Sequence, residues 1–352
     1  DMGLGKTLQS LVFLAIYREE CAQNLKRPCL IVAPTGLLAN WIDEIERHLG
    51  DEGLGRIVNA YGAGMKELRD GSVGKDVDFG VPMLNTSKLA SAGVVLTTYE
   101  SLRNYSISFA MVPFGVAVFD EVQKVKNPKV PLTRAAAAIN ASFQVGLSGT
   151  PVENSLADLW SIMDVVAPRR IKHSLLDCMK EFSGNTEHFD TRRKLQVLHS
   201  ELTTPSELSP APILRRLKSE VFQSGGLPKK VLHSASKTSG VMPEAQAQAY
   251  SDQLRSVQKG EIKMIQALQA FRRISLSHRP YERWLDNPKS FVDESARLTE
   301  FFKILDEVSQ KSEKALIFLD SRELQPILAQ VLKERYKLSK LPLIINGEVS
   351  GP

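Results

Sequence analysis

The stretch Gly3-Leu4-Gly5-Lys6-Thr7 lies near the start of the chain, and Val116-Ala117-Val118-Phe119-Asp120-Glu121 lies well downstream. The first has the form of the end of a phosphate-binding loop, where glycines, a lysine and a hydroxyl surround nucleotide phosphates. The second is an apolar run ending in two carboxylates, as in a strand that holds Mg²⁺. Alone, the first is explained equally well by an ordinary strand-to-helix turn, and the second is explained better by a helix N-cap. Together they predict an α/β fold of the P-loop NTPase class.

Each residue of these two stretches has an expected chemical role. Lys6 would contact the β- and γ-phosphates, and Glu121 would orient and deprotonate the attacking water. ATP and Mg²⁺ are therefore the predicted cofactors. The predicted nucleotide-binding residues are Gly3, Leu4, Gly5, Lys6 and Thr7, the metal ligands Thr7 and Asp120, and the catalytic residues Lys6, Asp120 and Glu121.

A third polar stretch, Leu147-Ser148-Gly149-Thr150-Pro151, follows another apolar run. These residues are turn formers, so one explanation is a plain turn ahead of a helix near Glu153. Their place at a strand end favours a second explanation, in which they sense the γ-phosphate and pass that state to a nucleic-acid-binding face. We therefore predict Ser148, Gly149 and Thr150 as coupling residues. The three stretches together indicate an ATP-driven nucleic-acid motor.

Residues 1–166 alternate short β-branched runs with helical patterns, as parallel α/β sheets do. The periodicity of Gly36–Leu49 predicts an amphipathic helix. The expected strands are Cys29–Ala33, Arg56–Ala60, Val94–Thr98, Val116–Asp120 and Gln144–Leu147.

Two of these strands end in hydroxyl residues. Pro34-Thr35 follows the first, and Thr97-Thr98 closes the third. Because ligands of open α/β sheets bind at the carboxyl ends of strands, we expect these residues to share one edge with Asp120 and Glu121. Hydroxyls and backbone N–H groups there suit phosphate oxygens and do not read base sequence. A helix cap is the simpler explanation for each pair alone. Pro34, Thr35, Thr97 and Thr98 are predicted to contact DNA.

The rest of the chain changes character twice. Residues 167–290 are expected to form helical protrusions and a linker, with a polar loop at Ser183–Pro212. Residues 291–352 return to an α/β pattern and indicate the incomplete start of a second lobe. The elements expected there are a helix at residues 297–310, a buried strand at Ala315–Leu319, a helix at Ser321–Tyr336 and a strand at Leu343–Asn346.

The composition gives only weak functional signals. The net charge of +5 leans mildly towards a polyanionic partner. Three cysteines without metal-ligand spacing fit a reducing cytosol, and no apolar run approaches the ~20 residues needed to span a membrane. We therefore expect no membrane partner and a cytoplasmic, nucleoid-associated location.

The motifs resemble those of the Swi/Snf-related DNA-dependent ATPases of helicase superfamily two, particularly the bacterial members. Gln123 stands where many members carry His, and it keeps a hydrogen-bonding group towards motif III. Basic residues in the family-like linker extend the predicted DNA contacts to Arg215, Arg216, Lys229 and Lys230. The matching stretches are Asp1–Gln9 (motif I), Leu30–Trp41 (Ia), Thr97–Glu100 (Ib), Asp120–Gln123 with Lys126–Pro128 (II), Leu147–Pro151 (III), Ile213–Val221 with Leu227–Lys230 (linker), Ile274–Pro280, and Lys314–Ser321 (IV).

The resemblance implies two RecA-like lobes with ATP between them, and movement along double-stranded DNA without strand separation. Residues 1–166 would be the first lobe, with Gln123 as a further coupling residue, and residues 291–352 the start of the second. The chain begins at Asp1 inside motif I, so we expect a piece cut at both ends. Motifs V and VI, with the arginine fingers, would lie beyond Pro352. The piece alone is therefore expected to hydrolyse little ATP.

Two other functions remain open. The first is a module that binds nucleotide or DNA without hydrolysis, which would have no need of a carboxylate at Glu121. The second is a strand-separating helicase or restriction translocase of the same superfamily. The Ile213–Val221 linker weighs against this one. The physiological target is not encoded in these motifs.

Overall fold

The computed structural model describes residues 3–21, 27–50, 53–69, 75–76, 82–149, 156–168, 189–205, 210–221, 231, 242–284 and 287–347. The chain divides into two compact units, residues 1–227 with 351–352, and residues 228–350. Among the described residues, no helix combines the length and apolarity needed to cross a bilayer.

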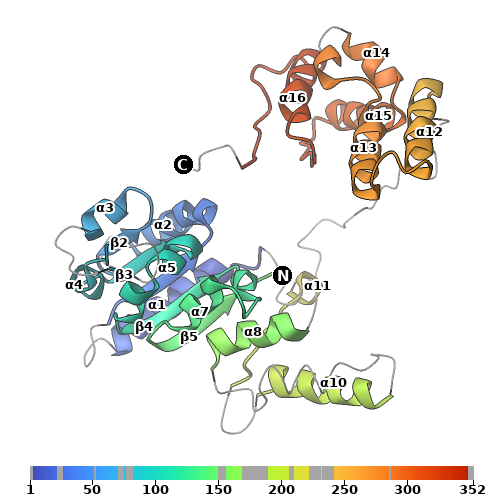
Figure 1. Cartoon of the computed structure of the whole chain (residues 1–352). Helices are drawn as coiled ribbons and strands as arrows, with labels where there is room; N and C mark the ends of the chain where they lie inside the picture. The colour runs from blue at the N-terminus through green and yellow to red at the C-terminus, as the bar shows by residue number, and fades with distance from the viewer. Residues whose placement is uncertain are drawn as a thin grey trace. The chain divides into compact units, whose positions relative to one another are not determined.

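A five-stranded parallel sheet forms the centre of the first unit, with strand order β2-β3-β1-β4-β5 (Figure 1). This confirms the α/β prediction. Two strands have the predicted bounds, while β4 and β5 begin earlier than their apolar runs indicated. The strands are β1 (Cys29–Ala33), β2 (Ile57–Ala60), β3 (Val94–Thr98), β4 (Phe114–Asp120) and β5 (Ala141–Leu147).

Helices cover both faces of this sheet and make a three-layer unit. Trp41 and Ile45 of α2 pack with Leu11 and Leu14 of α1 on one face. The helices α5 to α8 pack on the other face. The helices of this unit are α1 (Lys6–Cys21), α2 (Thr35–Leu49), α3 (Gly64–Arg69), α4 (Thr86–Ala90), α5 (Tyr99–Asn104), α6 (Ser106–Ala110), η1 (Val122–Val125), α7 (Pro131–Ala137), α8 (Leu156–Val166), α10 (Phe189–Thr203) and α11 (Lys218–Val221).

The strand register aligns the carboxyl ends of the strands. Ala33 of β1 pairs with Thr98 of β3, and Asp120 of β4 pairs with Leu147 of β5. The segments that follow these strands therefore leave the sheet at one edge, as predicted.

The helix α10 corrects the loop expected at Ser183–Pro212, because residues 189–203 are helical. Leu198 and Leu202 of α10 pack with Leu159 and Met163 of α8. The helix was not predicted because most residues of α10 are polar. Its narrow apolar stripe is nevertheless enough for a surface helix to pack on one neighbour.

The described part of the second unit is helical. Its core surrounds Trp284, Phe302 and Leu328, and α12 packs against α13. Since α13 also packs against α15, residues on both sides of the boundary expected at residue 290 belong to one unit. The helices are α12 (Glu244–Gln258), α13 (Met264–Leu276), η3 (Tyr281–Trp284), α14 (Pro288–Asp293), α15 (Ala296–Gln310) and α16 (Leu324–Arg335).

The two strands predicted in the second unit are not formed. Residues 315–319 and 343–346 have no strand assignment, and the side chains of Phe318 and Leu343 are 88% and 96% exposed. A β-strand requires a neighbour whose backbone completes its hydrogen bonds. Among the described residues of this unit neither segment has such a neighbour, so the apolar runs stay exposed.

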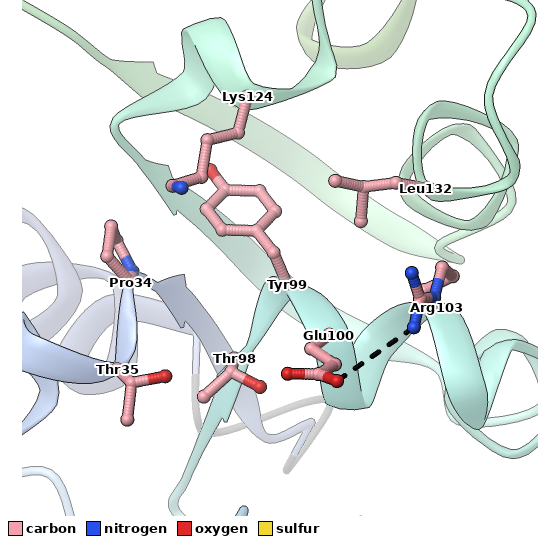
Figure 2. A pocket seen from close by; sticks show the side chains of 8 residues that line it. All are labelled: Pro34, Thr35, Thr98, Tyr99, Glu100, Arg103, Lys124 and Leu132. Carbon is pink, nitrogen blue, oxygen red and sulfur yellow. Dashed lines mark ion pairs between the residues drawn. The ribbon is translucent and has the colours of Figure 1, made fainter. Parts of the chain in front are cut away.

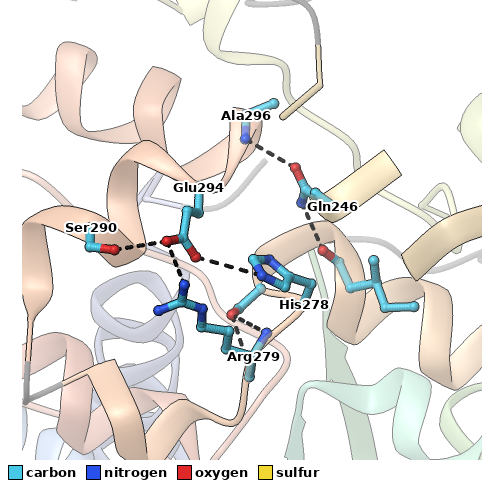
Figure 3. Close-up of polar contacts among 8 residues, drawn as sticks. Gln246, His278, Arg279, Ser290, Glu294 and Ala296 are labelled. Carbon is cyan, nitrogen blue, oxygen red and sulfur yellow. Dashed lines mark hydrogen bonds and ion pairs between the residues drawn. The ribbon is translucent and has the colours of Figure 1, made fainter. Parts of the chain in front are cut away.

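A polar network joins the helices of the second unit (Figure 3). Gln246 of α12 donates to the Ile274 carbonyl at 2.7 Å and accepts from the Ala296 amide at 3.2 Å. Glu294 accepts from Ser290 Oγ at 2.8 Å and pairs with Arg279 at 2.7 Å. These contacts cross-link α12, α13, α14 and α15.

We expect Phe302→Ala to destabilise the second unit by about 3–5 kcal/mol, because it empties a fully buried ring site. Hydrogen exchange measured at increasing temperature should show that α15 and α16 lose protection at a lower temperature in the variant. The sheet should lose protection at the same temperature as in the parental protein. Phe318→Ala, at an exposed ring of the same unit, is the matched control. Equal loss of protection in both units would contradict their division.

Candidate functional site

The phosphate-loop stretch leads directly into α1. Gly3 and Gly5 have φ values of 74° and 72°, in the left-handed region that glycine adopts without a Cβ penalty. Lys6 is the first residue of α1, and Gln9 closes the loop by donating from Nε2 to the Leu4 carbonyl at 2.8 Å. The first turn of a helix offers unpaired N–H groups and a dipole that favours anions. Residues 3–7 thus have the backbone that a phosphate-binding loop requires.

Asp120 is buried at the end of β4 and is held by three donors. Its Oδ2 accepts from the indole Nε1 of Trp41 at 3.0 Å, and its Oδ1 from the Glu121 amide at 3.0 Å. Its backbone carbonyl accepts from the Tyr99 hydroxyl at 2.7 Å. Burial raises the pKa of Asp120, the two N–H donors oppose that, the charge of Glu121 adds to it, and the charge of Lys6 lowers it. The lysine of the loop therefore lies within electrostatic reach of the carboxylate.

Trp41 and Tyr99 hold Asp120 in place, a role that was not predicted for either residue. Trp41 is buried, and its indole N–H donates to one carboxylate oxygen of Asp120. Burial is the largest cause that raises the pKa of Tyr99 well above its ordinary range, so its hydroxyl stays a donor. Both residues fall within the stretches that resemble motifs Ia and Ib, which was the available signal.

Glu121 has an unusual backbone. Its φ and ψ are both 52°, a left-handed conformation that costs a residue with a side chain about 1–3 kcal/mol. Its Oε2 accepts from Gln123 Nε2 at 2.6 Å, and Gln123 Oε1 accepts from Ser148 Oγ at 2.8 Å. The expected coupling residues Gln123 and Ser148 therefore form one chain of hydrogen bonds with Glu121. Gly149 follows Ser148, while Thr150 lies outside the described residues.

A pocket of about 410 Å³ opens at the same edge of the sheet (Figure 2). Three of its residues, Pro34, Thr35 and Thr98, were predicted to contact DNA. Thr98 also caps α5 by accepting from the Ser101 amide at 3.0 Å, so the capping explanation holds as well. The full lining is Pro34, Thr35, Thr98, Tyr99, Glu100, Arg103, Lys124 and Leu132.

Sequence reasoning did not single out the two cations of this pocket, Arg103 and Lys124. Glu100 lies 3.9 Å from Arg103 and pairs with it across one turn of α5, as Figure 2 shows. Lys124 belongs to η1, directly after Gln123, which was predicted to be a coupling residue. The pocket thus combines two cations, a partly neutralising carboxylate and the first turn of α2.

Thr97 corrects one of the predicted DNA contacts. Its side chain is 0% exposed, and its hydroxyl donates to the Ala60 carbonyl at 2.8 Å within the sheet. Side chains alternate between the two faces of a strand, so Thr97 and Thr98 cannot both point the same way. The Thr97 hydroxyl is therefore not available to a phosphate.

Arg215 and Arg216, two of the predicted basic contacts of the linker, do not line this pocket. Arg215 and Arg216 are exposed, while Lys229 and Lys230 lie outside the described residues. Lys218 approaches the phosphate loop, with its Nζ 3.6 Å from the position that a Cβ would take at Gly3. This approach was not predicted.

The residues fit a magnesium ion shared with a nucleotide. Within the part of the chain that the structure describes, no group of three or more His, Cys, Asp or Glu could hold a metal alone. Mg²⁺ commonly takes one or two protein carboxylates together with substrate phosphates and water. Asp120, a carboxylate near Lys6, is of this kind, and Thr7 is the second residue of α1, the helix that follows the loop.

Comparisons with known proteins agree with this geometry. The SNF2-related domain matches residues 1–288. The chain is 33% identical to the Zorya protein ZorD of Escherichia coli, over 99% of this chain and 32% of that protein. It is 28% identical to an uncharacterized ATP-dependent helicase of Mycoplasma pneumoniae, over 90% of this chain and 27% of that protein. The chain thus spans about a third or less of these relatives.

Among solved structures, the chain is similar to the SWI2/SNF2 ATPase core of Sulfolobus solfataricus in complex with dsDNA. The identity is 22% and the TM-score 0.49, with 96% of this chain and 65% of that chain covered. The domain match over residues 1–288 shows the family: the chain belongs to the SNF2-related, helicase-like ATPases. The predicted family and its RecA-like parallel sheet are confirmed.

Proposed function

We propose that this chain carries the ATP-hydrolysing site of a motor that moves along double-stranded DNA without separating its strands. The observation that carries the proposal is the shared sheet edge, where Asp120 and Glu121 adjoin a pocket suited to DNA phosphates. In this proposal residues 1–166 are the first lobe, residues 167–290 the protrusions and linker, and residues 291–352 the start of a second lobe. The protein would act on DNA in the cytoplasm.

Hydrolysis would use the residues at the strand ends. The loop of residues 3–7 and Lys6 would hold the triphosphate, and Thr7 and Asp120 would hold Mg²⁺, which neutralises charge on the β- and γ-phosphates. Glu121 would take a proton from the attacking water. Its carboxylate is already oriented by Gln123, and Gln123 is in turn bound to Ser148. A change at the γ-phosphate would therefore be passed through this chain of hydrogen bonds to the segment that follows β5.

The Glu121–Gln123 bond also favours hydrolysis over a module that only binds nucleotide. A carboxylate held by a 2.6 Å hydrogen bond next to Asp120, the proposed metal ligand, would suit general-base work. A strand-separating helicase would share this chemistry. The experiment that distinguishes such a helicase from the proposed motor asks whether the two DNA strands separate during ATP hydrolysis.

DNA binding would use backbone contacts alone. The first turn of α2, Thr98, Arg103 and Lys124 offer N–H groups, a hydroxyl and cations, which suit phosphates and do not read base edges. The exposed Arg215 and Arg216, with Lys229 and Lys230, would extend this track along the linker.

We expect the affinity for duplex DNA to be independent of sequence and to fall by about tenfold or more between 50 and 200 mM salt. Each contact between a cation and a DNA phosphate releases bound counterions, so added salt opposes binding, and a few such contacts are enough for this fall. Two unrelated duplexes of equal length, titrated by fluorescence anisotropy at both salt concentrations, measure this. Lys124→Gln should flatten the salt dependence, while Lys66→Gln, on the exposed side of α3, should not. A strong preference for one duplex would rule out the backbone-contact model.

A further inference from the structure

Asp120 is held by one side chain that lines the neighbouring pocket and by another from a helix whose first residue lines it. Tyr99 lines the pocket and donates its hydroxyl to the Asp120 carbonyl at 2.7 Å. Trp41 donates its indole N–H to Asp120 Oδ2 at 3.0 Å from α2, the helix whose first residue, Thr35, also lines the pocket. Tyr99 and α2 thus border the pocket and also hold Asp120, the proposed metal ligand.

A third connection reaches Glu121. Lys124 lines the pocket, and its backbone amide donates to the Glu121 carbonyl at 3.0 Å. This bond belongs to η1, the single turn that also carries Gln123. Residues that line the pocket therefore contact both Asp120 and Glu121, the adjacent residues that the proposed reaction needs.

The residues that connect the pocket to Asp120 are close to it and lie in well-packed parts of the core. Trp41 is 1% exposed and packs in the core between α2 and the sheet, and Tyr99 is fixed in the core on the opposite face. Thr35 and Trp41 lie on one continuous helix, and such a helix moves largely as a body when its first turn is displaced. Close-packed interiors transmit small displacements because no free volume absorbs them.

We propose that Tyr99 and Trp41 are positioning residues through which a DNA backbone phosphate in the pocket sets the placement of Asp120. The inference rests on the proposed function and deepens it, because it names the residues that make hydrolysis depend on DNA. An occupied pocket fixes the first turn of α2 and the start of α5. Their donors then hold the Asp120 carboxylate and carbonyl in the arrangement that the metal requires.

Tyr99→Phe tests this in the full-length protein, because it removes only the hydroxyl that reaches Asp120. The steady-state ATPase rate is measured with and without duplex DNA, and the ratio of the two rates is the readout. We expect the ratio to fall about three- to tenfold, the size expected for losing one buried hydrogen bond. The rate without DNA should fall by a smaller factor than the rate with DNA, because the proposal has these donors fix Asp120 fully only when the pocket is occupied.

Tyr105→Phe is the matched control, since Tyr105 is also buried but its hydroxyl is bound by the side chain of Arg69, away from Asp120. It should leave the ratio unchanged. Trp41→Phe, which removes the other donor, should lower the ratio as Tyr99→Phe does, and thermal unfolding confirms that each variant is folded.

The outcomes separate the two proposals. A parental protein that shows no stimulation by DNA overturns the proposed function and this inference with it. A stimulated parental protein whose ratio is unchanged in Tyr99→Phe overturns the inference alone. A fall in both rates by the same factor also overturns it, because that result assigns Tyr99 a purely structural role.

Discussion

Glu121→Gln is expected to lower the rate of ATP hydrolysis by roughly 10²–10⁴-fold while ATP still binds. The change keeps the size of the side chain and an oxygen that can accept from Gln123 Nε2, so the bond that now measures 2.6 Å can persist. It removes the group that takes the proton from water. The left-handed backbone at residue 121 is equally strained with either side chain. The loss should therefore appear in turnover and not in stability.

The measurement is phosphate release under saturating ATP, together with binding of a fluorescent ATP analogue. Glu46→Gln, at an exposed carboxylate of α2, is the control and should be indistinguishable from the parental protein. Glu121→Gln should also hold DNA more stably with ATP than with ADP, because it stops after nucleotide binding. Hydrolysis at the parental rate would show that Glu121 is not the base.

Lys6→Ala is expected to weaken ATP binding by about ten- to a hundredfold, since it removes charge-assisted hydrogen bonds to the phosphates. Lys6 begins α1, and its charge already lowers the pKa of Asp120, so the substitution removes that effect as well. Lys66→Ala, on the exposed side of α3, removes an equal charge away from the site. Titration of a fluorescent ATP analogue measures both variants. An unchanged affinity in Lys6→Ala would remove the phosphate-loop assignment.

The sequence was most informative where one local pattern decides the structure. The strands Cys29–Ala33 and Val94–Thr98 are buried along their whole length and rich in apolar and β-branched residues, since both faces of the parallel sheet are covered, and their bounds were predicted correctly. The motifs likewise placed Asp120 and Glu121 at the end of β4. Patterns of this kind depend only on neighbouring residues.

The missed features depend on partners that are distant in sequence. The bond from Trp41 to Asp120 joins residues 79 positions apart, and no local pattern encodes it. Thr97 was predicted as an exposed contact because the strand end was located without deciding which face each threonine takes. The strand predicted at Ala315–Leu319 failed for the same reason, because pairing requires a neighbouring strand that the described residues do not offer.

The most direct test of a duplex-tracking motor follows ATP and both DNA strands in one reaction. The full-length protein is mixed with ATP and a duplex whose strands carry a fluorophore and a quencher, and phosphate release is recorded beside fluorescence. We predict that the duplex stimulates phosphate release, that Glu121→Gln abolishes this, and that the strands remain annealed. Release of the labelled strand, or a rate indifferent to duplex DNA, would contradict the account.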